Sequence, residues 1–293
     1  MASVADAAFQ EIRVRVRTHL VEHSWLFTQG SPRPRRVDWP EATAIGSAVP
    51  SELTNTLFVR KRVADARRLI ADAQQYFGRS AAWRVLAPSE LSEGLDPAAL
   101  AAGLHPGATA PLLILRPIPP SPALPPGLTI RPVREERTLR DFCAAGGRGF
   151  RIPAWMLRVA IPKAPTPSSR EEATVCLRVG YVGGRPVATS AAVSKDGLVG
   201  VFFVTTVPEA RRRGYGAALT SAAIEDGRRA GAEASYLHAT AMGRPVYEQM
   251  GFRWAEDYLE WLPTVSGFGQ LRALLRMFGL ALRRPRPTRD PSS

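Results

Sequence analysis

Apolar positions recur with two different periods along the chain, and the change from one period to the other outlines its elements. Between residues 63 and 77 the apolar side chains return every three or four positions, which predicts a helix with one buried face. Residues 9–27 also predict a helix, although the alternation of Ile12, Val14 and Val16 permits a strand. Residues 31–50 are rich in proline, arginine and small side chains and predict a loop. Short apolar runs predict strands over residues 53–59, 83–86 and 112–115.

The second half of the chain predicts a more regular arrangement. Three apolar runs joined by glycine-containing turns predict an antiparallel meander, followed by alternating helices and strands. The expected strands span residues 128–132, 174–181, 187–193, 198–207, 235–239 and 257–262, and the expected helical segments span residues 135–145, 153–159, 214–230 and 243–250. This layout predicts an α/β fold with a mixed, mostly antiparallel sheet that is flanked by helices.

Proline content suggests how the chain is divided. Residues 117–127 contain six prolines, and such a stretch is extended and stiff, so we place a linker there. The division predicts an N-terminal α/β domain over residues 1–116 and a second domain over residues 128–263. Residues 264–293 form a basic tail, with five apolar side chains on one helical face. We expect this tail to pack on its own domain; contact with an anionic membrane surface is the alternative.

Composition narrows the class of protein. Apolar residues make up 45% of the 293 residues, which is enough for a sizeable core. No apolar stretch is long enough to span a membrane, and no signal peptide is evident, so we expect a soluble cytoplasmic protein. Two cysteines provide neither a disulfide framework nor a zinc site, and we expect no metal. The net charge of +13 favours a polyanionic or phosphorylated partner, but nothing indicates nucleic acid.

The segment from Val207 to Gly216 has the features of a site for a phosphorylated ligand. Proline follows Val207 and ends the strand, and Gly214 and Gly216 allow the backbone to turn tightly into a helix. The first turn of that helix offers unpaired N–H groups and the positive end of its dipole. The intervening arginines, Arg211 to Arg213, add positive charge. The Walker and dinucleotide patterns fit less well, and an ordinary strand-to-helix turn remains the alternative.

Two signatures together resemble those of a known superfamily. Arg211-x-x-Gly214-x-Gly216 after a Val-Pro pair resembles the acetyl-CoA motif of the GNAT N-acetyltransferases, and Tyr247 with Gly251-Phe252 resembles their second signature. The resemblance covers residues 128–263 and implies the GNAT fold and acetyl transfer from acetyl-CoA to a primary amine. The N-terminal half resembles a degenerate GNAT domain in the order of its elements only. Since it has no glycine-rich loop, we expect no second active site there.

The resemblance also implies roles for individual residues. Acetyl-CoA is expected in a V-shaped cleft where the third and fourth sheet strands of the domain splay apart. The expected cofactor-binding residues run along the strand and into the helix: Val204, Thr205, Thr206, Val207, Arg211, Arg212, Arg213, Gly214, Tyr215, Gly216 and Ala217. Tyr247 is expected near the sulfur, where a phenol can give a proton to the leaving thiolate. Packing beside Phe252 is the structural alternative for this tyrosine.

The general base is the least defined part of the expected site. Many members of the superfamily carry a glutamate on the strand before the loop, but residues 198–204 contain no carboxylate. His238 ends the next strand and is the candidate base, with a purely structural histidine as the alternative. Phe150, Trp155 and His238 are candidates for the acceptor site. Two other functions remain open: a non-catalytic acyl-CoA-binding sensor, or an adaptor that binds polyanions through the tail.

Overall fold

A computed structural model describes residues 4–49, 51–52, 54–78, 82–161 and 174–263. The first half contains a long helix followed by short strands and two further helices. Its elements are α1 Val4–Gln29, β1 Arg35–Asp38, β2 Ala42–Gly46, β3 Thr56–Val59, α2 Ala66–Phe77, β4 Arg84–Pro88, the 3₁₀ turn η1 Ser89–Leu91, α3 Leu95–Ala101, β5 Leu104–Pro106 and β6 Ala110–Leu115. The predicted helix over residues 9–27 is confirmed as α1, and the alternative of a strand there is wrong.

The second half contains the longer strands. Its elements are β7 Leu128–Pro132, α4 Glu136–Phe150, α5 Ala154–Ala160, β8 Thr174–Val182, β9 Arg185–Lys195, β10 Leu198–Thr206, the 3₁₀ turn η2 Pro208–Ala210, α6 Tyr215–Arg229, β11 Ala234–His238, α7 Arg244–Gln249 and β12 Arg253–Pro263. Most of these elements lie where the apolar pattern predicts them. The last strand starts four residues earlier than expected, because its polar first residues pair with β6 rather than with a sequence neighbour.

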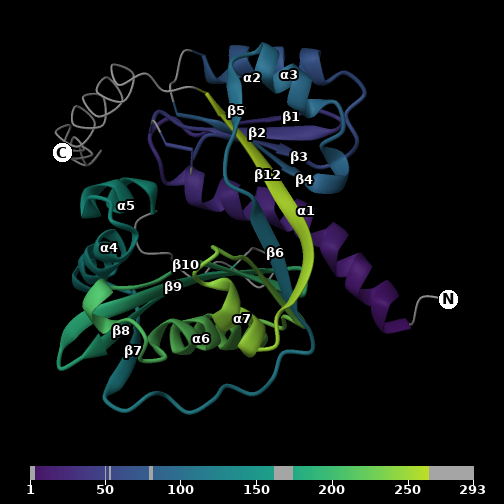
Figure 1. Cartoon of the computed structure of the whole chain (residues 1–293). Coiled ribbons are helices and arrows are strands. Elements are labelled where there is room, and N and C mark those ends of the chain that lie inside the picture. The colour runs from purple at the N-terminus through teal and green to yellow at the C-terminus, as the bar shows by residue number, and fades with distance from the viewer. Residues whose placement is uncertain (1–3, 50, 53, 79–81, 162–173, 264–293) are drawn as a thin grey trace, which may run out of the picture.

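A single sheet of twelve strands runs through both halves, in the order β1-β2-β3-β4-β12-β6-β11-β10-β9-β8-β7, with β5 paired to β12. The two halves exchange strands at its centre. β6 comes from the first half but pairs with β11 of the second, while β12 comes from the second half and pairs with β4 of the first (Figure 1). Each half therefore completes the sheet of the other. The limits proposed above for two domains stay a prediction.

Each half repeats the same unit of a strand, a helix and a parallel strand. In the first half β3 and β4 are parallel and α2 connects them; in the second half β10 and β11 are parallel and α6 connects them. All other strand pairs are antiparallel. The expected mixed, mostly antiparallel α/β sheet flanked by helices is thus confirmed.

Helices cover both faces of the sheet in the second half (Figure 1). Alternate residues of β9 show this: Ala191 packs in a cluster with Phe142 of α4, whereas Ala188 packs in a cluster with Leu219 of α6. In the first half α2 and α3 cover β2 to β4, and α1 runs across the junction, where its Val16 packs with Tyr236 of β11. No helix in the described part of the chain is long and apolar enough to cross a membrane.

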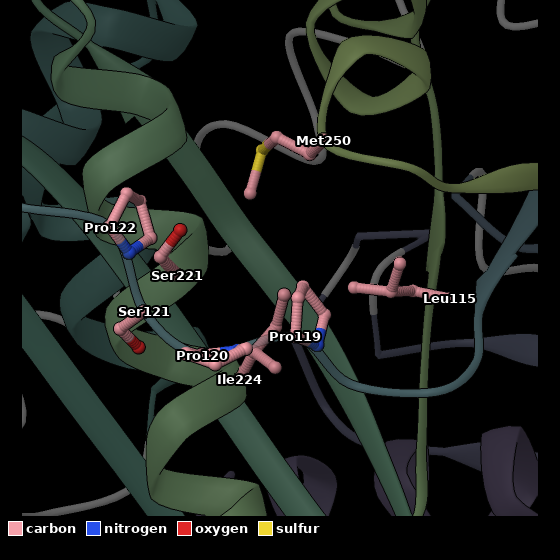
Figure 2. A pocket seen from close by; sticks show the side chains of 8 residues that line it. All are labelled: Leu115, Pro119, Pro120, Ser121, Pro122, Ser221, Ile224 and Met250. Carbon is pink, nitrogen blue, oxygen red and sulfur yellow. The ribbon is translucent and has the colours of Figure 1, made fainter.

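The proline-rich segment 117–127 lies outside the sheet and passes along α6. Pro119 to Pro122 face Ser221 and Ile224 of that helix, and Met250 and Leu115 close the other side of a small hollow (Figure 2). Six of the eight lining residues are apolar, and the other two are Ser121 and Ser221, so the segment contacts α6 mainly through apolar side chains. The segment therefore connects the exchanged strand β6 to β7 along the outside of the second half.

One prediction for the first half is wrong. Residues 31–50 contain β1 and β2, which form a hairpin, instead of a single loop. Polar side chains hold part of this hairpin, so the strands show little of the apolar alternation by which a strand is predicted. Thr43 donates a hydrogen bond to Asp38 at 2.6 Å, and Arg36 pairs with Asp38 at 2.9 Å. All residues of β2 are buried and most are small, with Ala42 and Ala44 in a cluster with α2 and Ile45 in a cluster with α1, so the hydrophobic signal of this strand is low. The tail over residues 264–293 lies outside the described residues.

Candidate active site

The cleft of the second half arises from two parallel strands that separate. β10 and β11 pair only at their first residues, from Leu198 with Ala234 to Gly200 with Tyr236. β10 then continues to Thr206, while β11 ends at His238, without further pairing between them. Because the two strands diverge in this way, backbone groups on the facing edge of β10 have no ladder partner on that side. The cleft lies between the fourth and fifth strands expected for the second domain, β10 and β11. The expected position between the third and fourth strands is wrong, because β9 and β10 pair along their whole length apart from the bulge in β10.

A β-bulge in β10 changes the direction of the backbone inside this cleft. Phe202 pairs with Ala191 and Thr205 pairs with Thr189, so two residues of β10 face a single residue of β9. Phe203 adopts a φ of 51°, and its carbonyl accepts a hydrogen bond from the Thr189 hydroxyl at 2.8 Å. The bulge leaves Phe203 and Val204 out of the regular ladder. It thus supplies backbone groups for a ligand at the point where the strands separate.

A cavity of about 370 Å³ occupies the cleft. Most of the expected cofactor-binding residues line it, together with Tyr247 on the opposite wall. The lining residues from the expected set are Val204, Thr205, Thr206, Arg211, Arg212, Gly214, Tyr215, Gly216 and Ala217. Two expected residues lie outside the lining: Val207 is buried and its N–H donates to the carbonyl of Val187 at 2.9 Å, and Arg213 is exposed. Most of the expected cofactor-binding residues, from the end of β10 and from the start of α6, therefore line one cavity.

The start of α6 is open toward the cavity. Gly214 is the N-cap residue, with a φ of 77°, and no side chain caps the helix. A left-handed backbone favours glycine, so a larger side chain here would be strained. The first N–H groups of an α-helix have no partner inside the helix and carry the positive end of its dipole. The turn therefore suits the binding of an anion.

The three arginines of the loop have different positions. Arg211 is tied to the backbone: its guanidinium donates to the carbonyl of Thr206 and to that of Gly149, each at 3.1 Å. It therefore fixes the loop to the end of α4 while adding positive charge nearby. Arg212 lines the cavity with an exposed side chain and a φ of 61°, so it is the arginine placed to reach an anion there.

Tyr247 reaches the cavity from α7 and is also packed. Its ring lies 5.9 Å from that of Phe252, which agrees with the packing contact weighed from the sequence. Burial raises the pKa of the Tyr247 hydroxyl, and a hydrogen bond with Thr220 partly opposes that rise. The phenol is therefore protonated at neutral pH and can donate a proton. Tyr247 therefore both packs against Phe252 and lines the cavity.

His238 does not line the same cavity as Tyr247. It lies on a second, adjoining cavity, where its ring is 4.6 Å from that of Tyr258. Burial, with a smaller contribution from the charge of Arg84, lowers the pKa of His238 to about 3. Phe150 lines both cavities, whereas Trp155 lines neither of them. Two of the three candidate acceptor residues are thus brought together, on the second cavity.

The second cavity contains functional candidates that the sequence did not reveal. Nine of its fifteen lining residues come from the first half of the chain: Leu20, His23, Ser24, Phe27, Glu52, Thr54, Phe58, Arg84 and Leu86. These residues lie on α1, β3, β4 and the segment before β3 and have no shared motif. Their only local signal is the helical spacing of Leu20, Ser24 and Phe27, which places them on one face of α1.

Comparison with known families agrees with this geometry. Residues 197–255 match a family model described as an acetyltransferase (GNAT) domain. This range contains β10, the loop, α6, β11 and α7, which together provide most of the wall of the first cavity. This segment has the sequence signature of a GNAT domain. No curated protein matches the sequence.

Solved structures show how far the GNAT fold extends along the chain. A GCN5-related N-acetyltransferase from Kribbella flavida is 18% identical, with a TM-score of 0.67, and the match covers 88% of this chain and 97% of that one. Another from Sphaerobacter thermophilus is 17% identical, with a TM-score of 0.52 and coverage of 77% and 81%. A tandem GNAT protein from the clavulanic acid biosynthesis pathway is 13% identical, with a TM-score of 0.53 and coverage of 81% and 86%. Both halves therefore take part in the shared fold.

Proposed function

We propose that this protein is an N-acetyltransferase that moves an acetyl group from acetyl-CoA to a primary amine. The observation that carries the proposal is that the uncapped start of α6 and Tyr247 line the same cavity. A pyrophosphate suits the N–H groups that follow Gly214 and the charge of Arg212. The bulge residues Phe203 and Val204 offer backbone partners for the pantetheine and the acetyl carbonyl.

The chemistry follows from these positions. A neutral amine attacks the thioester carbonyl, the new C–N bond forms, and the C–S bond breaks. A backbone N–H near Thr206 can donate to the carbonyl oxygen as its negative charge grows. The thiolate then takes a proton from the Tyr247 hydroxyl, and the proton lost by the nitrogen returns to the tyrosine through solvent. The products are an amide and the free thiol of CoA.

His238 fits a role in orienting the amine better than the role of base first assigned to it. A base works best when its pKa is close to the working pH, and the pKa of His238 is about 3. Its Nε2 is buried without a hydrogen-bond partner among the described residues, so it can accept a hydrogen bond from the amine. We therefore expect the acceptor to lose its ammonium proton to water before the attack.

Turnover separates this proposal from the non-catalytic alternative. The absence of a carboxylate from β10 favours an acyl-CoA-binding module, because nothing on that strand can act as a base. Purified protein is incubated with acetyl-CoA and a panel of primary amines, and free thiol and acetylated product are measured together. Equal amounts of both, formed over many turnovers, support the enzyme. Tight acetyl-CoA binding without product from any amine would show that the protein is a binding module.

A further inference from the structure

A second cavity, of about 400 Å³, lies beside the acetyl-CoA cleft and between the two halves of the chain. Phe150 lines both cavities, and successive residues of β10 are divided between them. Phe202 and Phe203 belong to the second cavity, and Val204 begins the lining of the first. Because the β10 bulge lies between these residues, a molecule in the second cavity lies next to the expected position of the acetyl group.

The wall of the second cavity is mainly hydrocarbon. Nine of its fifteen lining residues are apolar and five of these are phenylalanines: Leu20, Phe27, Phe58, Leu86, Phe150, Ile152, Leu157, Phe202 and Phe203. His23 adds a flat surface, since its ring is stacked on Phe202 with an interplanar angle of 8°. A ligand gains affinity in such a wall by burying carbon atoms, and aromatic rings suit it best.

The polar groups of the cavity are few and mostly uncharged. Burial holds the pKa of His23 well below its ordinary value, so its ring is neutral, as is that of His238. Arg84 carries charge but is already paired, with Glu260 at 3.3 Å and with the Thr56 hydroxyl at 3.2 Å. The carboxylate of Glu52 is the single acidic group of the lining, and its residue is exposed. The cavity thus offers very little negative charge to hold cations.

We propose that the acceptor is a small monoamine carried on an aromatic or branched hydrocarbon body, and that this body lies in the second cavity. The inference rests on the proposed acetyl transfer and specifies its substrate class. The body contacts the phenylalanine wall, and the amine lies by Phe150 and Phe203, toward the thioester. His238 and His23 accept or donate single hydrogen bonds without requiring a second charge on the ligand.

Other amine classes fit this lining less well. A polyamine or an aminoglycoside carries several ammonium groups, and the single carboxylate of the lining, Glu52, can pair with only one of them, so the others would lie against phenylalanine without a partner. The lysine of a protein would place a long peptide at the entrance, whereas this cavity has the size typical of a small-molecule site. A hydrophobic monoamine buries its carbon atoms and leaves no charge unpaired once its amine is neutral.

The test uses the full chain with acetyl-CoA and four probes: 2-phenylethylamine, spermidine, glucosamine and Nα-acetyl-lysine. We expect kcat/KM for 2-phenylethylamine to exceed the other three values by about 10–100-fold, which is the gain from burying an aromatic ring. Calorimetry with CoA present should show the same order of binding. Preference for spermidine, glucosamine or the lysine derivative would overturn the assignment of this substrate class.

A substitution in the wall ties the preference to this cavity. Ser24 lies on α1, at a lining position that belongs to the first half, and so lies outside the acetyl-CoA cleft. Ser24→Asp adds a carboxylate and should lower kcat/KM for 2-phenylethylamine about tenfold while raising it for spermidine. The side chain in Ser24→Asn has nearly the shape of the one in Ser24→Asp but no charge. This variant should keep the native preference for 2-phenylethylamine over spermidine. Acetyl-CoA affinity and melting temperature, measured for both variants, verify that the first cavity and the fold are intact.

The two proposals fail in different ways. If 2-phenylethylamine binds, and Ser24→Asp weakens that binding while Ser24→Asn does not, but no amide forms, acetyl transfer is refuted and the hydrophobic amine site stands. If amide forms only with spermidine, glucosamine or Nα-acetyl-lysine, acetyl transfer stands and the substrate class is wrong. Equal effects of the two Ser24 variants on all probes would show that the second cavity does not hold the acceptor.

Discussion

The helices α2 and α6 occupy the same place in the two halves of the molecule but begin in opposite ways. Asp65 is the N-cap of α2, and its carboxylate accepts a hydrogen bond from the backbone N–H of Arg68 at 3.0 Å. Gly214 is the N-cap of α6, and no side chain caps that helix. A helix start attracts anions. The first half satisfies this start with its own aspartate, whereas the second half leaves it open for a ligand.

The supporting loops are otherwise alike. Arg60 follows β3 and donates to the carbonyls of Trp39 and Ala42 at 2.8 and 3.1 Å. Arg211 follows β10 and donates to the carbonyls of Thr206 and Gly149. Both halves therefore use an arginine to hold the turn between strand and helix. The repeated scaffold therefore differs at the N-cap of its connecting helix, and under the proposed function this difference restricts the phosphate site to the second half.

The first half retains a structural role and provides a wall for the acceptor. Strand exchange makes the halves depend on each other, since β6 and β12 each pair across the centre of the sheet. Ion pairs add to this junction, where Arg17 of α1 contacts Glu256 of β12 at 3.0 Å in a buried position. A half that has no phosphate loop can thus still determine which amine is accepted.

The largest effect is expected from Tyr247, which has no tyrosine counterpart on α3 of the first half. Tyr247→Phe removes the proton donor and should lower kcat by roughly 10²–10⁴-fold, with acetyl-CoA affinity nearly unchanged. The rate of free-thiol release at saturating concentrations of both substrates measures kcat. Tyr181→Phe is the control: it removes a hydroxyl that donates to Asp141 at 2.8 Å, on a strand away from both cavities. Near-native turnover in Tyr247→Phe would limit this residue to packing.

The paired arginines give the next test of the comparison. Arg211→Ala should weaken acetyl-CoA binding by about tenfold, because two hydrogen bonds that order the phosphate loop are lost. Arg60→Ala removes two comparable hydrogen bonds in the first half. It should lower the melting temperature but leave acetyl-CoA affinity unchanged. Calorimetry and thermal unfolding separate the two outcomes. Loss of acetyl-CoA affinity in both variants would indicate that the loops do not have separate roles.

The histidines at the junction of the halves predict how stability depends on pH. Burial lowers the pKa of His19 to about 4 and that of His238 to about 3, and His23 is lowered in the same direction. Below about pH 6.5 the unfolded chain binds protons that the folded chain cannot, so stability is present above that pH and falls as pH drops toward 4. His19 and His238 should each cost on the order of 2 kcal/mol at pH 5, and His23 should add to the loss in the same direction.

Denaturant unfolding at pH 7.5 and pH 5.0 measures this loss. His19→Gln removes one of the three groups and should reduce the difference between the two pH values. His19 accepts or donates a buried hydrogen bond with the Tyr236 hydroxyl at 2.8 Å, so the variant is less stable at both pH values. The quantity to compare is therefore the change in unfolding free energy between pH 7.5 and pH 5.0, in the native protein and in the variant. An unchanged pH difference in His19→Gln would show that His19 does not contribute to it.

The smallest effect is expected at the capped helix. Asp65→Ala should destabilise the fold by about 1 kcal/mol, the usual value of an N-cap hydrogen bond. It should leave acetyl-CoA affinity and stoichiometry unchanged, because the first half has no glycine turn or cavity-lining arginine beside α2. Chemical unfolding and calorimetry provide both values. A second equivalent of acetyl-CoA bound by this variant would mean that Asp65 alone blocks a site in the first half.

Local signals explain what could be predicted from the sequence. The phosphate turn at Gly214 and the tyrosine at position 247 lie within short motifs, so the first cavity was predicted almost completely. Long-range pairing was not predictable, since nothing near β6 or β12 shows that these strands pair in the opposite half. The second cavity depends on that pairing, and residues such as His23 and Arg84 carry no local motif. The position of His238 was predicted, but its separation from Tyr247 depends on the splayed strands.

Transfer of the aspartate cap to the second half tests the central claim most directly. Gly214→Asp gives α6 the N-cap residue of α2, and Gly214→Asn has nearly the shape of the aspartate variant without its charge. The left-handed backbone strains both variants to a similar extent, and less than it would strain most other residue types. Calorimetry should show one acetyl-CoA per native chain, binding weakened by about 10–100-fold in Gly214→Asp, and a much smaller loss in Gly214→Asn. Equal affinity in the aspartate and asparagine variants, or two equivalents bound to the native chain, would contradict the account.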